Sequence, residues 1–176
     1  MLRIPSLLAI CFLTACSRNP APTPDHRALE TPAGEAVLRH VLSICPHRSE
    51  AKLLTIVIGP RLDSATSAFE KKFTDTGLTV TPSAKLVAGA VNGEVRIFEG
   101  NTNQTPVILQ ISTLTPEPAN PANYEATAAW SYKDKIQRWK LRVVSKPDQT
   151  FDITPIEEIP IAPRNQDGMP APPDKT

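Results

Sequence analysis

The fold of this chain is decided by YEATAAWSY (Tyr124–Tyr132), in which aromatic residues and alanines alternate with mostly polar residues. A period of two predicts a β-strand that turns one face to a core and the other to solvent. The alanines on the apolar face leave room for a helix to approach. This stretch therefore predicts one strand of an antiparallel sheet that is covered on one face.

Segments with the same period lie on both sides of this stretch. Lys85–Val91 and Glu94–Glu99 flank Asn92-Gly93, which is the strongest short hairpin signal in the chain. Two more alternating strands are expected at residues 107–112 and 138–143. A turn at residues 146–149 then leads into a last strand that begins at Phe151. Together these segments predict an antiparallel meander sheet of about five or six strands.

Helical spacing precedes the meander. Thr31 can cap a helix whose apolar face repeats every three to four residues until a proline ends it. The continuous apolar run Leu53–Ile58 has the length of a buried strand. Asp63 or Ser64 then has the character of an N-cap for a second helix, which ends before Gly77.

Helices first and a long meander afterwards predict a single α+β domain over residues 32–159. In it, the N-terminal helix, the buried strand and the second helix pack on the antiparallel sheet. The arrangement resembles the cystatin-like and nuclear-transport-factor-2-like families, in which a helix lies in a curved antiparallel sheet. Those folds serve enzymes and binding proteins alike, so the resemblance implies a fold and no particular activity.

The first sixteen residues have the pattern of an export signal. A single Arg3 precedes an apolar run of secretory length, well under the ~20 residues needed to span a bilayer. The segment resembles a bacterial lipoprotein signal peptide, with LTAC (Leu13–Cys16) as its lipobox. The resemblance implies that residues 1–15 are removed, and that Cys16 carries a diacylglyceryl group on its sulfur and an acyl group on its amine. The alternative is an ordinary signal peptide with a chance cysteine.

Proline-rich segments follow this signal and end the chain. Residues 16–31 predict an extended tether between lipid and domain, and residues 160–176 repeat its composition. Neither segment has an apolar period, so we expect both to be disordered. Ser17 resembles the sorting signal for the outer membrane in enteric bacteria. The expected location is therefore the outer membrane, facing the periplasm.

The mature chain expected from this cleavage carries no net charge. The sequence holds 19 Lys and Arg against 18 Asp and Glu, and removal of Arg3 leaves 18 of each with His neutral. Nucleic-acid binders need a basic footprint, so we expect no nucleic-acid partner. Attachment to the membrane then comes from the acyl chains on Cys16. Cys45 remains as one free thiol, which permits no disulfide within the chain.

Three residues come nearest to a metal-ligand set, namely His40, Cys45 and His47. The first two lie five residues apart on the predicted helix, so one face cannot present both, and Cys45 is better explained as a small apolar core residue. The adjacent carboxylates Glu157-Glu158 point apart on an extended segment. Asp63 could act as a general base in a cavity, but helix capping explains it without chemistry. We therefore expect no catalytic residue, cofactor or metal site.

One predicted hairpin gathers positive charge. Arg138, Lys140 and Arg142 share one strand face, opposite an apolar face of the same strand. Such a strip could contact phosphate or carboxylate groups of the cell envelope, or an acidic partner protein. The alternative is a solvated sheet face, on which basic residues also discourage edge pairing.

These observations predict a membrane-anchored, non-enzymatic binding or assembly module of the cell envelope. The alternative is a small periplasmic hydrolase or isomerase with a pocket between helix and sheet, which would need Asp63, His40 or Glu125 to face inward. The alternation instead puts alanine, aromatic and aliphatic residues on the inner face, which predicts a dry core.

Overall fold

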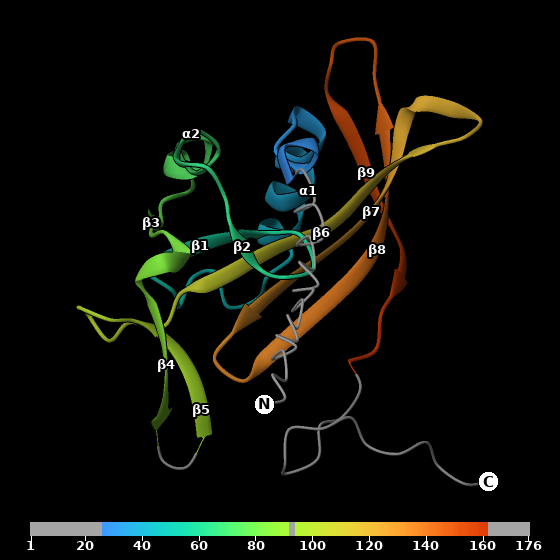
Figure 1. Ribbon diagram of the computed structural model, residues 1–176. Helices are drawn as coiled ribbons and strands as arrows, with labels where there is room; N and C mark the ends of the chain where they lie inside the picture. Colours follow the sequence, from blue (N-terminus) through green and yellow to red (C-terminus); the bar gives the residue numbers. More distant parts are fainter. Residues whose placement is uncertain (1–25, 92–93, 162–176) are drawn as a thin grey trace, which may run out of the picture.

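The computed structural model describes residues 26–91 and 94–161, and its architecture is mixed α+β with a large, mostly antiparallel sheet (Figure 1). The predicted class and the predominance of antiparallel pairing are thus confirmed. The predicted signal peptide, Cys16, most of the tether, the Asn92-Gly93 turn and residues 162–176 of the tail lie outside the described residues. The prediction of a disordered tether is wrong for its last residues, because His26–Leu29 form a 3-10 helix and Leu29 is buried in the core.

In chain order the elements are η1 (His26–Leu29), α1 (Pro32–Ser43), β1 (Leu53–Ile58), β2 (Asp63–Ser64), α2 (Ser67–Glu70), η2 (Lys71–Thr76), β3 (Thr79–Val80), η3 (Ser83–Lys85), β4 (Leu86–Val91), β5 (Glu94–Glu99), β6 (Val107–Glu117), β7 (Asn120–Tyr132), β8 (Lys135–Ser145) and β9 (Phe151–Glu158), where η denotes a 3-10 helix.

The main sheet has the strand order β2-β1-β6-β7-β8-β9, and β3 also pairs with β1. Strands β6 to β9 form the antiparallel meander that the alternation predicts. Strand β1 departs from that pattern, because it runs parallel to both β6 and β3. Every residue of β1 is buried, which is usual for a parallel strand covered on both faces.

The hairpin of β4 and β5 is a second departure from the predicted meander. Its two strands pair only with each other and form a separate two-stranded sheet. The hairpin projects away from the helices at the lower left of Figure 1. The predicted strands are therefore present, but they form an arm beside the main sheet.

The core lies between α1 and the inner face of the meander. The helix contacts β6, β7, β8 and β9, and Val37, Leu38 and Val41 are fully buried on it. Ala126 and Ala128 of β7 are fully buried as well, as is expected for small residues beneath a helix. Each buried Val or Leu side chain stabilises the fold by roughly 1.5–3 kcal/mol, so this apolar layer dominates the energetics.

Capping explains where the two helices begin. Thr31 Oγ1 accepts a hydrogen bond from the Gly34 backbone N–H at 3.2 Å at the start of α1. The predicted start of the second helix at Asp63 or Ser64 is wrong, since these residues form β2 and Thr66 caps α2 instead. Threonine is also a preferred N-cap residue, although it ranks below aspartate and serine, so the cap signal alone did not locate the residue.

The second helix is also shorter than predicted. Four α-helical residues continue as a 3-10 helix to Thr76, where Gly77 takes a left-handed conformation with φ 80°. Phe69 and Phe73 pack edge to face in the core, with ring centroids 5.6 Å apart. These two rings give the segment the helical spacing visible in the sequence.

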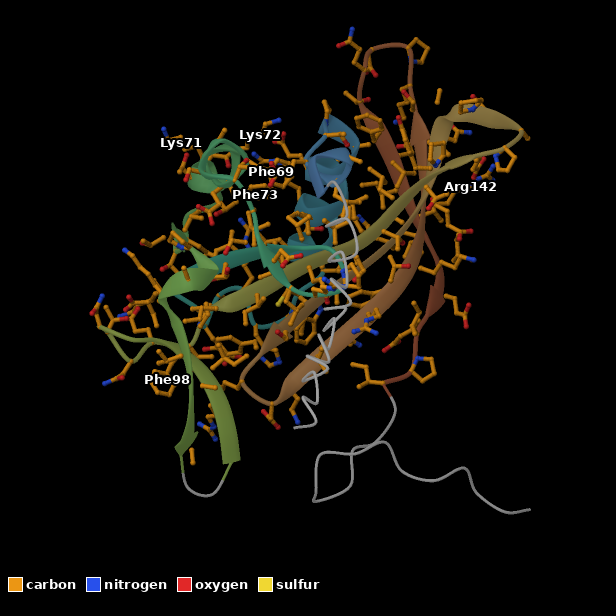
Figure 2. All side chains as sticks on the ribbon, in the orientation of Figure 1. Phe69, Lys71, Lys72, Phe73, Phe98 and Arg142 are labelled. Atoms are coloured by element: carbon orange, nitrogen blue, oxygen red, sulfur yellow. The ribbon has the colours of Figure 1, made fainter. Side chains whose placement is uncertain are left out.

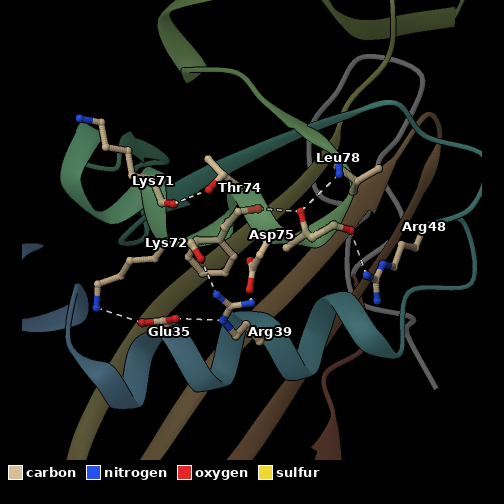
Figure 3. A network of polar contacts seen from close by, with 10 residues as sticks. Glu35, Arg39, Arg48, Lys71, Lys72, Thr74, Asp75 and Leu78 are labelled. Carbon is tan, nitrogen blue, oxygen red and sulfur yellow. Dashed lines mark hydrogen bonds and ion pairs between the residues drawn. The ribbon is translucent and has the colours of Figure 1, made fainter.

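Ion pairs join this segment to α1 (Figure 3). Glu35 accepts from Arg39 Nε and from Lys72 Nζ, each at 2.9 Å. Arg39 also pairs with Asp75 at 3.1 Å, donates to the Lys72 carbonyl and lies over the Phe73 ring. One arginine thus connects a helix turn, a carboxylate, a carbonyl and an aromatic ring.

Candidate functional site

The basic strip lies on the outer face of β8. Lys140 and Arg142 alternate there with Trp139, Leu141 and Val143, which are buried on the inner face. The predicted division of this strand into an apolar and a basic face therefore holds at these positions.

Acidic side chains from neighbouring segments compensate the strip. Lys140 Nζ pairs with Glu125 Oε1 on β7 at 2.9 Å. Arg142 binds Glu117 through two parallel hydrogen bonds of 2.8 and 3.1 Å, and the bond from Arg142 lowers the pKa of Glu117. Arg138 is the third residue of the basic strip, and its Nε atom is buried without a hydrogen-bond partner among the described residues.

Sequence reasoning missed these acids because they lie on other strands. Glu125 stands directly opposite Arg142 in the register of β7 and β8, and Glu117 ends β6. Alternation shows which face of a strand a residue occupies, but it does not say which strand is its neighbour. Two of the three predicted contact residues are therefore already engaged within the molecule.

The part of the chain that the structure describes does not gather His40, Cys45 and His47 into one cluster. Over residues 26–91 and 94–161 there is no group of three His, Cys, Asp or Glu side chains that could hold a metal ion. His40 Nε2 is buried without a hydrogen-bond partner in this part of the chain, and burial lowers the pKa of His40. The His47 ring instead stacks on Tyr132, 5.4 Å between centroids, and its Nδ1 is 2.9 Å from Glu50 Oε1.

Cys45 lies in the apolar core, where the sequence places it. Its side chain is buried, and burial raises the pKa of the thiol above its usual value. A thiol that ionises less readily is a poorer nucleophile. Cys45 therefore serves packing in this environment.

Two hollows open on the surface of the described residues. The larger, about 400 Å³, is lined by residues of the α1–β1 loop and the end of η2: Cys45, Pro46, Arg48, Ser49, Ala51, Thr76, Gly77 and Leu78. The smaller, about 260 Å³, is lined by Glu50, Lys52, Gln104, Thr105, Tyr132 and Lys133. Neither is lined by Asp63, His40 or Glu125, the residues that the pocket of the enzymatic alternative would need.

The predicted carboxylate pair is likewise not gathered around a pocket. Glu157 and Glu158 are exposed at the end of β9, opposite Lys140 and Trp139 respectively. Asp63 lies in β2, opposite Ile58 of β1. These carboxylates come from separate parts of the sheet.

The projecting hairpin exposes the apolar surface that sequence reasoning did not single out. Val87 of β4 is 44% exposed and Ile97 of β5 is 41% exposed, and both belong to a sheet of only two strands. Ile97 lies on one face of the hairpin and Val87 on the other. Phe98 shares the face of Val87 and covers Gly89 there, since a Cβ at Gly89 would lie 2.8 Å from the Phe98 ring. Figure 2 places Phe98 on this arm and Arg142 at the far end of the main sheet.

The alternation of the hairpin gives its two faces different character. Leu86, Ala88 and Ala90 share one face with Ile97, whereas Arg96 lies on the same face as Phe98. An isolated two-stranded hairpin is marginally stable in water. The hairpin therefore has both an open apolar face and a physical reason to acquire a partner.

Comparisons with protein-family models, curated proteins and solved structures found no match to this chain. The likeness to cystatin-like and nuclear-transport-factor-2-like folds thus stays a resemblance of pattern. Within the described ranges, no helix has the length and hydropathy needed to cross a membrane.

Proposed function

We propose that this chain is a lipid-anchored protein of the bacterial cell envelope that acts as a non-enzymatic binding or assembly module. In this proposal, Cys16 carries the acyl chains, the residues between Cys16 and η1 are the tether, and the α+β body faces the periplasm from the outer membrane. The lipobox Leu13–Cys16 supports the anchoring, and the zero formal charge of the expected mature chain leaves attachment to the lipid.

The observation that carries the binding role is the β4–β5 hairpin. It stands apart from the main sheet and exposes Val87 and Ile97 on opposite faces. Apolar side chains on a projecting element are suited to burial against another protein, because each removes water-exposed surface without desolvating a charge. We therefore assign partner docking to this hairpin.

The basic strip remains a second candidate contact, for an anionic envelope component or an acidic protein. Arg138, Lys140 and Arg142 carry that proposal, but a partner would have to compete with Glu117 and Glu125 for two of them. Competition of this kind lowers affinity, because each incoming anion replaces an existing ion pair. Val87 and Ile97 are uncharged and require no such exchange, so the hairpin is the better supported contact.

A photo-crosslinking experiment in intact cells tests the docking role. A benzophenone amino acid is placed at Val87, and a matched one at Ile136 of β8, whose side chain is 41% exposed. We expect a discrete covalent product from position 87 that is lost in an Ala88→Lys background. Ile156→Lys, at a residue 52% exposed on β9, is the control and should leave the product unchanged.

Equal products from positions 87 and 136 would argue against a docking role of the hairpin, as would persistence of the product in the Ala88→Lys background. The absence of any product from position 87 would do the same.

A further inference from the structure

We infer that two copies of this chain pair through the free edge of β4, so that their hairpins join into one four-stranded antiparallel sheet. The inference rests on the proposed docking role of the hairpin and names its occupant as a second copy of the chain. It comes from the strand sequences, the backbone register and the pattern of side-chain sizes along β4.

The two edges of the hairpin differ in charge. Strand β5 reads EVRIFE and carries three charged residues, whereas β4 reads LVAGAV and carries none. Edge strands that stay unpaired are normally protected by charged residues, prolines or bulges. Strand β4 has no charge and no proline, and its register with β5 runs without a shift from Leu86 to Val91. Its outer edge is therefore built to accept a strand, and that of β5 is not.

The backbone of β4 directs its free hydrogen-bonding groups at alternate residues. Gly100 N–H donates to the Lys85 carbonyl at 3.0 Å, so Lys85 and Gly100 form a hydrogen-bonded pair at the base of the hairpin. Bonded and non-bonded pairs alternate in antiparallel sheets. The N–H and C=O groups of Leu86, Ala88 and Ala90 consequently point to the outer edge, where the described residues provide no pairing strand.

A second β4 fits this edge in an antiparallel register centred on Ala88. Ala88 then faces Ala88 of the second copy, Leu86 faces Ala90, and Val87 faces Gly89. In this register, the residues whose N–H and C=O groups point to the outer edge, Leu86, Ala88 and Ala90, lie opposite the same set in the second copy. Each such pair can exchange two backbone hydrogen bonds. A larger side chain faces a smaller one at every other position, and no like charges meet.

Pairing would also remedy the marginal stability of the isolated arm. Two joined hairpins make a four-stranded sheet, and a sheet needs three or more strands with an apolar face, or a helix packed on it, for independent stability. The two copies would be related by a two-fold axis perpendicular to the joined sheet. Such an axis keeps each face on the same side, so the faces that carry Leu86, Ala88, Ala90 and Ile97 become continuous. Anchoring of both copies in one membrane would raise their effective concentration and favour this contact.

Disulfide trapping in the full-length chain, expressed in bacterial membranes, tests the register. In a hydrogen-bonded antiparallel pair the two Cα atoms lie about 5.5 Å apart, within the range of a disulfide. Ala88→Cys should therefore give a covalent dimer on mild oxidation. Ala90→Cys is the matched control, because its counterpart lies four residues along the strand, more than about 13 Å away. We expect at least a ~10-fold higher yield from Ala88→Cys, with the unaltered chain as background.

A proline variant tests the edge by a second route. Ala88→Pro removes only an outward N–H and should leave the pairing of β4 with β5 intact. We expect light scattering in detergent to give a dimer mass for the unaltered chain and a monomer mass for this variant. A monomer mass for the unaltered chain, an unchanged dimer in Ala88→Pro, or equal crosslinking at positions 88 and 90 would overturn the pairing.

Failure of the pairing can be told from failure of the docking role. A product from position 87 that contains a different protein, together with no Ala88→Cys dimer, would leave the hairpin as a docking element and exclude the second copy. No product from position 87 and no dimer would remove both proposals.

Discussion

At the scale of single residues, Glu70 places a buried carboxyl close to a second acid. Its side chain is 7% exposed, and burial, with a smaller contribution from Glu30, raises the pKa of Glu70. Both oxygens of Glu30 are held in place by Thr66, whose N–H and Oγ1 donate at 2.6 Å. The Oε1 atom of Glu70 has no hydrogen-bond partner among the described residues.

We predict that Glu70→Gln stabilises the fold at pH 7. The folded chain holds the Glu70 proton more tightly than the unfolded chain, so the free energy of unfolding falls as pH rises from the unfolded pKa through the folded pKa. Above that window the full penalty of the buried charge remains, and an amide avoids it. Thermal unfolding should give a higher Tm for Glu70→Gln at pH 7, with the difference shrinking below about pH 4.

Glu157→Gln is the matched control, because Glu157 is exposed on β9. Its Tm should stay near that of the unaltered chain, since surface substitutions usually change stability by no more than about 0.5 kcal/mol. A Tm for Glu70→Gln that is lower at pH 7, or a difference that does not vary with pH, would contradict this interpretation of Glu70.

At the scale of elements, the approach of η1 to α1 depends on one glycine. A Cβ at Gly34 would lie 1.9 Å from the Leu29 carbonyl oxygen and 3.1 Å from its carbon. Both are backbone atoms, so the contact cannot be relieved by turning a side chain. Gly34 also donates to the Thr31 cap, which ties the start of the helix to the same position.

Gly34→Ala should therefore displace η1 and destabilise the protein by about 1–3 kcal/mol, the usual cost of overpacking a tight site. This loss is expected although alanine favours helices over glycine. Urea unfolding measures it, with Gly100→Ala as control, because a Cβ at Gly100 meets its neighbours at 3.6 Å or more. A variant Gly34→Ala as stable as the control would show that η1 is not held against α1.

The elements also show what the sequence could and could not predict. A period of two identified β6, β7 and β8, because each strand buries one face against α1. The register between strands and the parallel partner of β1 were not predictable, since both depend on which strands become neighbours. The same limit concealed Glu117 and Glu125 as partners of the basic strip.

The hairpin shows a related limit. Alternation and the Asn92-Gly93 dipeptide predict that β4 and β5 pair, which they do over six register positions. Neither signal indicates that the hairpin stands apart from the main sheet, because its position depends on how the segments before β4 and after β5 pack. The best supported candidate contact was therefore visible as a hairpin and not as a docking element.

At the scale of the whole molecule, the proposed protein combines a lipid anchor with a projecting arm. The packed body of α1 and the main sheet gives the arm a firm base, since its core residues are buried. A proline-rich tether would let this body sit away from the lipid, so that the hairpin can reach a partner. The proposal thus depends on Cys16 being acylated.

The most direct measurement is the intact mass of the chain extracted from the membranes of the bacterium that makes it. The account predicts a chain that begins at Cys16 and carries the added mass of a diacylglyceryl group and an amide-linked acyl chain. Cys16→Ala should abolish this species and release the protein from the membrane fraction. A mature chain that begins elsewhere, or that carries an unmodified Cys16, would contradict the proposed anchoring.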